Sequence, residues 1–402
     1  MHNQMKIYQD IYIQKFSSAS DEIRYLVGCG GQYYETGVAV VNLIGALKKH
    51  DTEDEAIDTF IRDCNKKYTK EQIRDAIRKY ISPILECKDG GKQFLYQKEI
   101  MSAQDIDRFS DSLKLLFDKY IMGSVVVVAL CLDAVFFMTT NNMLTFNNKV
   151  NAYTVIGLLL FMLASSFFHE LGHAAACKRF GIRHGGIGFG LYLNFPVLYT
   201  DVTEVWKLSR AKRCAVNIAG VYFQLICMIP IIIGFMLTGN DILRYMIIIM
   251  NFGFVMTLNP FFKFDGYWLT SDILGVPNLR QRSKELVAYY INKVRRRPAL
   301  EKPYLMQMRK KSKWGFTAYA VVVNLFMAYY FLYILPLFIY NFALSFPMES
   351  KQLAMYLANN VTPPFVLLRN IGAQLLFFAL IIYMVYNIFL KKKIIKHETP
   401  VQ

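Results

Sequence analysis

Residues 154–177 read TVIGLLLFMLASSFFHELGHAAAC, an apolar run that ends in two histidines and a glutamate. About 20 consecutive apolar residues are enough for a helix to cross the hydrocarbon core of a bilayer. Ionisable side chains are costly at that depth, so they mark functional sites by default. The stretch therefore predicts a membrane-spanning helix that carries a polar site.

The whole chain has the composition of a membrane protein. It has 402 residues, of which 54% are hydrophobic and 15% are aromatic. Apolar runs of roughly the length of a spanning helix occur near 120–140, 154–176, 214–238, 242–262, 315–338 and 371–390. We therefore expect an α-helical polytopic membrane protein with about six transmembrane helices within residues 119–402.

The charge distribution predicts the topology. The net charge is +16, yet residues 1–120 hold 18 Lys and Arg against 19 Asp and Glu, so the excess lies between the apolar runs. It gathers in 177–213, 263–314 and 391–396, which fits the positive-inside rule with both termini in the cytoplasm. Residues 1–16 contain no apolar core of a signal peptide, which agrees with a cytoplasmic N-terminus. We expect a multi-pass protein of the cell (inner, cytoplasmic) membrane that contacts anionic lipid and binds no nucleic acid.

The sequence pattern of residues 1–90 predicts a small α+β soluble domain. The segment EIRYLVGCGGQYYE, residues 22–35, is rich in strand-forming residues and is interrupted by glycines, which indicates a β-hairpin. A hairpin followed by three short helices is a winged-helix-like arrangement. We expect a linker helix over 91–118 to lead into the first crossing.

Two of these helices carry start signals. Thr52-Glu-Asp-Glu and Thr69-Lys-Glu-Gln are capping boxes. After the second box, helical periodicity places Ile73, Ala76, Ile77 and Tyr80 on one face. We expect that face to be buried.

Residues 181–206 are glycine-rich and partly alternate between apolar and polar side chains. This pattern favours short strands at the membrane edge. Non-helical backbone at that depth must be covered by protein or water, so we expect the segment to border a cavity. We interpret His184 within it as a loop residue rather than a metal ligand.

The motif His169-Glu-Leu-Gly-His173 is H-E-x-x-H. Residues four apart share one face of a helix, so both imidazoles can bind one zinc ion with Glu170 beside it as general base. The alternative is a group of polar residues at a fraying helix end, but a position within a crossing argues against it. The seven cysteines form no C-x-x-C pair, so a cysteine-based zinc site is not predicted.

A catalytic zinc ion takes three protein ligands and leaves one position for water. The third candidate is Asp265, in MTLNPFFKFDGYW at the end of the fourth apolar run. In the expected topology, runs two and four both lead towards the cytoplasm. Asp265 should then lie at the depth of His169 and His173, near the cytoplasmic leaflet. Taken alone, Asp265 would be interpreted as a helix-end carboxylate, but pairing with the two histidines favours a metal ligand.

Together these residues resemble the site-2 protease family of intramembrane zinc metalloproteases. Pro260, Asp265 and Gly266 match the spacing of that family's N-x-x-P-x-x-x-x-D-G motif. The resemblance implies that Asp265 binds zinc and that an asparagine binds substrate. Thr257 stands at the asparagine position here and Asn259 lies nearby, so both are candidates. DGYW and the segment NFPVLYTDVTEVWKLSRAKR are similar to a bacterial branch of peptide zinc metalloproteases found with ribosomally made, modified peptides.

Residues 32–60 resemble a PqqD-like peptide-recognition domain. Such a domain implies that a leader peptide is added as a strand beside the wing, near Val27, Tyr33 and Tyr34. A generic soluble cap is the alternative. In 216–222, VNIAGVY, we expect Asn217 and Gly220 to allow close helix packing.

We therefore predict a membrane-embedded zinc endopeptidase. Zinc-activated water would attack a peptide carbonyl with Glu170 as base, and the reaction would remove a leader or mature a ribosomally made peptide. One alternative is a regulatory protease that cuts a transmembrane substrate such as an anti-sigma factor. The other is a non-catalytic membrane peptide carrier or immunity protein, for which Glu170 would be unnecessary.

Overall fold

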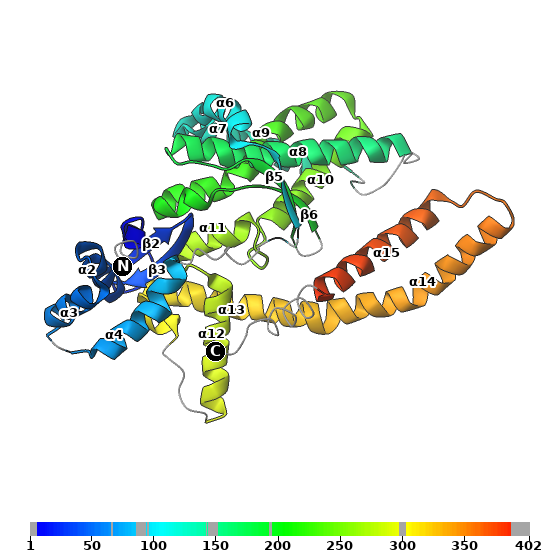
Figure 1. Cartoon of the computed structure of the whole chain (residues 1–402). Helices are drawn as coiled ribbons and strands as arrows, with labels where there is room; N and C mark the ends of the chain where they lie inside the picture. Colours follow the sequence, from blue (N-terminus) through cyan, green and yellow to red (C-terminus); the bar gives the residue numbers. More distant parts are fainter. Residues whose placement is uncertain are drawn as a thin grey trace. The chain divides into compact units, whose positions relative to one another are not determined.

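The computed structural model describes residues 6–65, 67–85, 94, 96–141, 143, 152–192, 195–296 and 303–386. The predicted basic tail, 391–396, lies outside them. The chain forms two compact units: residues 1–91, 99–188 and 198–318 in the first, and 92–98, 189–197 and 319–402 in the second. Figure 1 shows the chain coloured along its sequence, from blue at the N-terminus to red at the C-terminus.

The N-terminal domain contains an antiparallel sheet in the order β1-β2-β3. Its strands are β1 (Tyr12–Phe16), β2 (Arg24–Cys29) and β3 (Gln32–Gly37). Gly30 and Gly31 join β2 to β3 with positive φ angles of 57° and 79°, which a two-residue hairpin turn requires and glycine adopts without strain. The predicted hairpin is confirmed, and β1 adds a third strand.

Short helices cover one face of this sheet. They are α1 (Lys6–Gln9), α2 (Val38–Lys49), α3 (Glu53–Asp63), α4 (Lys70–Ala76) and α5 (Ser82–Leu85), with a π-helical turn at Ile77–Ile81 between the last two. Both predicted helix starts are confirmed. The Thr52 hydroxyl accepts a hydrogen bond from the Glu55 amide, and Thr69 forms a reciprocal capping box with Gln72.

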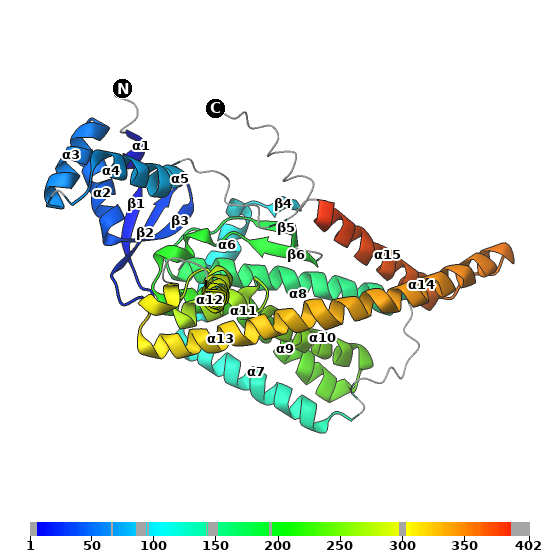
Figure 2. The same cartoon turned by 90° about the horizontal axis from the view of Figure 1, so that it is seen from below.

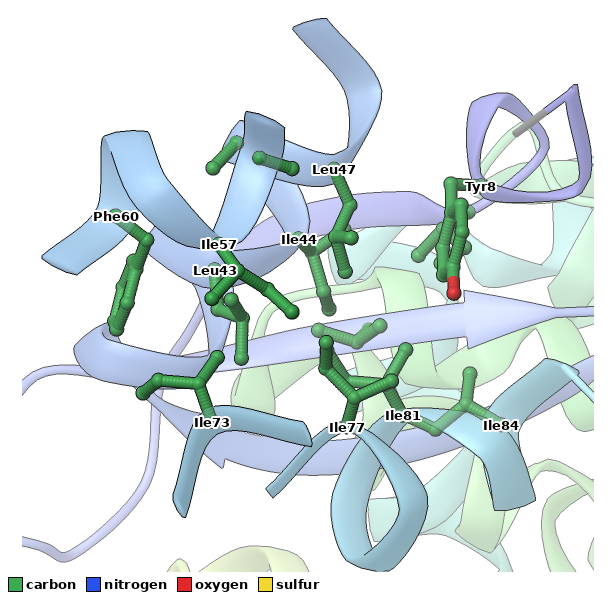
Figure 3. Packing of buried hydrophobic residues seen from close by; sticks show 14 residues of the cluster. Tyr8, Leu43, Ile44, Leu47, Ile57, Phe60, Ile73, Ile77, Ile81 and Ile84 are labelled. Carbon is green, nitrogen blue, oxygen red and sulfur yellow. The ribbon is translucent and has the colours of Figure 1, made fainter. Parts of the chain in front are cut away.

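The domain core consists mainly of aliphatic side chains that point toward one another between sheet and helices (Figure 3). Ile44, Ile57 and Ile81 are fully buried, whereas Tyr80 is 48% exposed. The expectation that Tyr80 would be buried is therefore wrong. The π-helical turn is wider than an α-helical one, so it rotates the buried face from Tyr80 to Ile81.

The opposite face of the sheet contacts residues after β6 in the same unit. The rings of Phe16 and Trp206 have centroids 6.2 Å apart, and the Lys207 ammonium lies over Tyr12 and Tyr33. These contacts cover part of the opposite face. Within the described residues, the outer edges of β1 and β3 have no partner strand.

Among the described residues, five helices are long and apolar enough to cross a membrane: Lys119–Thr139, Tyr153–Arg179, Arg210–Thr238, Lys310–Ala358 and Phe365–Tyr383. Four of them correspond to α7 (Lys119–Thr139), α8 (Ala152–Arg179), α9 (Arg210–Thr238) and α15 (Phe365–Val385). The fifth is one continuous helix made of α13 (Lys310–Tyr329), a π-helical turn (Tyr330–Ile334) and α14 (Leu335–Ala358). In the second unit, α14 and α15 form a helical hairpin, which Figures 1 and 2 both show.

The expected count of six crossings differs from these five. The fourth expected run, 242–262, is helical only over α10, Asp241–Thr257. Its 17 residues span about 26 Å at 1.5 Å per residue, slightly less than a typical hydrocarbon core. The helix ends early because the chain turns at Asn259 and Pro260 toward α11 (Asp265–Leu274).

A second sheet has the order β4-β5-β6, formed by β4 (Tyr96–Met101), β5 (Ile187–Tyr192) and β6 (Phe195–Thr200). Figure 2 shows these strands side by side. The predicted strands within 181–206 are confirmed. The expectation of a helix throughout 91–118 is wrong at β4, because pairing with a strand some 90 residues later overrides its local preference.

The helical part of that linker is α6 (Ala103–Leu113), followed by a 3₁₀ turn at Lys114–Phe117. The remaining elements are a 3₁₀ turn at Thr203–Lys207, α12 (Leu279–Val294) and a 3₁₀ turn at Tyr304–Gln307. A buried ion pair joins α9 to α11, since Arg213 Nε lies 2.5 Å from Asp272 Oδ1. Asn217 donates to the same carboxylate at 2.8 Å, so this residue bonds to α11 instead of merely allowing close packing.

Candidate metal centre

The H-E-x-x-H motif lies in the C-terminal half of α8, where the helix packs closely on α9. A Cβ atom on Gly172 would lie 2.5 Å from the Ala219 carbonyl oxygen, and one on Gly220 would collide with the His169 ring. Only glycine therefore fits at either position without a shift of backbone or ligand. The prediction that Gly220 allows close helix packing is confirmed.

Asp265 enters the site as the first residue of α11. A carboxylate is favourable there because the helix N-terminus carries partial positive charge. The next residue, Gly266, lies against the backbone of Leu258, where a Cβ atom would collide with the carbonyl group. This contact explains physically why glycine follows the aspartate in the Asp-Gly pair.

The structure brings His169, His173 and Asp265 together. Oδ2 of Asp265 lies 2.9 Å from Nε2 of His169 and 3.1 Å from Nε2 of His173, and the two Nε2 atoms are 3.2 Å apart. Ligand atoms on a tetrahedral zinc ion with bonds of about 2.0–2.1 Å would be separated by about 3.3 Å. The three atoms thus have nearly the spacing of one face of a zinc tetrahedron.

The chemistry of the three atoms also fits a cation. Nδ1 of His173 lies 2.8 Å from the Val216 carbonyl oxygen, which can only accept, so Nδ1 donates and the lone pair of the neutral ring is on Nε2. A carboxylate and two imidazole nitrogens in mutual contact are the donor set that zinc prefers.

Glu170 is buried beside this cluster and is not one of its three converging groups. Its backbone oxygen accepts a hydrogen bond of 3.2 Å from the Thr200 hydroxyl, which joins the motif to the end of β6. The edge of the second sheet therefore lies next to the motif, while the role of Glu170 as base stays a prediction.

The two candidate substrate-binding residues have other positions. Thr257 is the last residue of α10, and Asn259 Oδ1 accepts a hydrogen bond of 2.8 Å from the Phe261 amide in the turn that follows. Their role in substrate binding stays a prediction.

His184 lies elsewhere, as expected. Its Nε2 atom is 3.1 Å from Ser110 Oγ and 3.2 Å from Asp107, and its Nδ1 atom is 2.8 Å from the Gly185 carbonyl oxygen. Both ring nitrogens thus have protein partners, and the contacts of Nε2 join α6 to the segment before β5.

The sequence analysis missed Gln224 on α9. Its Oε1 atom lies 3.2 Å from Nδ1 of His169, and its Nε2 atom donates to Ser165 on α8. One signal could have identified it, because Gln224 is a polar residue inside the apolar run 214–238.

A search of curated proteins found one distant relative. The chain is 26% identical over 158 residues to "Putative peptide zinc metalloprotease protein YydH" of Bacillus subtilis (strain 168). The match covers 34% of this chain and 63% of that protein. No protein-family model matches the chain, and no solved structure matches it. The similarity supports a zinc metalloprotease and no finer classification.

Proposed function

We propose that the chain is a membrane-embedded zinc endopeptidase of the site-2 protease type. The main support is that one side-chain atom each of His169, His173 and Asp265 lie together at nearly the spacing of ligand atoms on a tetrahedral zinc ion. Glu170 is buried beside them. Two histidines and an aspartate would hold the ion and leave a fourth position open. Zinc bound there would supply Lewis-acid chemistry, polarising a peptide carbonyl and making water more acidic.

The side chains of the protein would move the proton. Glu170 would take a proton from the attacking water and deliver it to the nitrogen of the departing amine. The edge strand β6 gives an extended peptide a place to pair with main-chain groups beside the motif. Burial of the site among α8, α9 and α11 would limit access of other water molecules.

The proposed substrate is a precursor peptide whose leader binds the N-terminal domain, as in a PqqD-like module. A leader strand would pair at an edge of the first sheet, where main-chain N–H and C=O groups point outward. Tyr33 and Tyr34 lie on the edge strand β3, whereas Val27 is buried in the central strand and cannot touch an added strand. The proposed topology has both termini and the site towards the cytoplasm, with basic loops at anionic lipid.

Two other functions use parts of the same structure. A regulatory protease would cut a transmembrane protein at the same centre, and it would not need a peptide-binding edge on the N-terminal domain. A non-catalytic carrier or immunity protein could bind peptide or metal, but it would not need the carboxylate of Glu170. The variants described next separate binding from catalysis.

The test uses the full chain purified in detergent. The wild type should bind about one zinc ion per chain, and His169→Ala/His173→Ala should bind none. Glu170→Gln should keep its zinc and lose roughly 10²–10⁴-fold of peptide cleavage, since the amide cannot act as base. His184→Ala is the control for loss of an imidazole and should retain zinc. Zinc retained in the double histidine variant would overturn the proposal.

A further inference from the structure

Gln224 bridges the two helices that form the centre. From α9, its side-chain oxygen reaches Nδ1 of His169 at 3.2 Å. Its side-chain nitrogen lies 2.9 Å from the Ser165 hydroxyl and 3.4 Å from the Ser165 backbone oxygen. Ser165 and His169 are one helical turn apart on α8, so a single amide contacts the same face of that helix twice.

The partners fix the orientation of this amide. The backbone oxygen of Ser165 can only accept hydrogen bonds, so the NH₂ group of Gln224 must face it. The carbonyl oxygen of Gln224 then faces His169, and it too can only accept. Nδ1 of His169 must therefore carry the proton, which leaves the lone pair of the neutral ring on Nε2, the atom that faces His173 and Asp265.

The two histidines are oriented by different kinds of partner. Val216 supplies its backbone oxygen to His173, and no side-chain substitution removes that acceptor. His169 depends on the Gln224 side chain. A neutral amide also suits this depth, since a second carboxylate within a membrane helix would carry the cost of a buried charge.

We propose that Gln224 is a positioning residue for the metal centre: its amide oxygen holds His169 in the Nδ1-protonated form and fixes the direction of the Nε2 lone pair. The inference rests on the proposed zinc site. Outer hydrogen-bond partners of this kind typically change metal affinity by about 10–100-fold when they are removed. The competing explanation is that Gln224 only joins α8 to α9, as polar side chains do in membranes.

The two explanations predict opposite orders for two substitutions. Gln224→Leu keeps a similar size and apolar character but removes the acceptor, whereas Gln224→Glu keeps an acceptor oxygen and adds an ionisable group. A positioning role predicts that Leu weakens zinc binding and Glu largely preserves it. A packing role predicts that Leu is the milder change, because a carboxyl group is costly among membrane helices.

The experiment measures the zinc dissociation constant of the full chain in detergent by competition with a chelator. Gln224→Leu should bind zinc roughly 10–100-fold more weakly than the wild type, and Gln224→Glu should stay within a few-fold. Gln374→Leu is the matched control, because Gln374 is a half-buried glutamine of α15 that donates to Ser345 and Glu349. It should not change the zinc affinity.

Cobalt provides a second readout, because its visible spectrum reports ligand geometry independently of cleavage. The spectrum of Gln224→Glu should resemble that of the wild type, and Gln224→Leu should differ. Wild-type affinity in Gln224→Leu, or weaker binding by Glu than by Leu, would overturn the positioning role. Absence of zinc binding by the wild type, with no change in His169→Ala/His173→Ala, would instead overturn the proposed function.

Discussion

The core of the N-terminal domain and the α8–α9 contact hold their elements together in different ways. The first is a cluster of mostly aliphatic side chains, where Ile44, Ile57 and Ile81 interlock between a sheet and helices (Figure 3). The second depends on glycines, which have no side chain and so let the two helices come close. Gly172 lies against the backbone of α9, and Gly220 lies against the His169 ring.

The difference determines what a substitution does. In an aliphatic core, lost volume costs stability roughly in proportion to the cavity, and the fold remains. In the α8–α9 contact, volume added at Gly220 must displace the His169 ring or α9, so the damage falls on the candidate metal site. The first region should therefore respond in stability and the second in zinc binding.

The largest expected effect comes from adding a side chain at Gly220. In Gly220→Val the new Cβ would occupy the space of the His169 ring, so either the ring or α9 must move. Overpacking costs about 1–3 kcal/mol even where neighbours can adjust, and here the neighbour is a candidate ligand. We expect stoichiometric zinc binding to be lost, as measured by metal analysis after gel filtration.

Gly157→Val is its control. Gly157 lies on α8, and a Cβ atom there would meet nothing within 4 Å. This variant should bind zinc like the wild type. If Gly220→Val also binds zinc normally, the close α8–α9 approach is not needed for the centre and the contrast between the two regions fails.

The second prediction concerns the π-helical turn of the N-terminal domain. Ile81→Ala removes a fully buried side chain and should cost about 2–5 kcal/mol of domain stability. Tyr80→Ala removes an exposed ring and should stay within about 0.5 kcal/mol. Hydrogen exchange of the amides in α4 and α5 of the full chain would measure both, because local opening reports the stability of that region.

Zinc affinity should be the same in Tyr80→Ala as in the wild type. If Tyr80→Ala destabilises the domain more than Ile81→Ala, then Tyr80 is the buried residue, as the regular helical periodicity of the sequence predicts. The two substitutions therefore test the buried face directly.

The sequence predicted the centre better than its surroundings. The spacing of His169 and His173 on a helix is a local property, and Asp265 followed from topology and motif spacing. The bond from Gln224 to His169 depends on how α8 and α9 face each other, which no local pattern encodes.

The differences in fold have the same origin. Strand β4 exists because of pairing with β5, where Gly186 lets the backbone at Met101 come close. The face expected through Tyr80 assumed a regular helix, and one wider turn moved it to Ile81. Local signals such as the Thr69 capping box were reliable because all of their atoms lie within four residues.

The smallest expected effect concerns the edge of β3. Gly30 and Gly31 form a two-residue turn, so the flanking pair Cys29 and Gln32 is hydrogen-bonded and the next pair, Gly28 and Tyr33, is not. The Tyr33 amide then points away from β2, toward the outer edge. A leader strand added at this edge would accept a hydrogen bond from that amide.

Tyr33→Pro removes this N–H without breaking a bond to β2, and Tyr33→Ala removes the same ring while keeping the N–H. The comparison isolates one main-chain hydrogen bond, worth about 0.5–1.5 kcal/mol, which corresponds to roughly a 2–12-fold change in affinity. Titration of the full chain with its precursor peptide, identified from the neighbouring genes, should show weaker binding by the proline variant than by the alanine variant. A scrambled leader should bind all three proteins equally weakly. Equal affinities of the Pro and Ala variants for the true leader would exclude strand addition at β3 and favour the regulatory protease, which needs no peptide-binding edge.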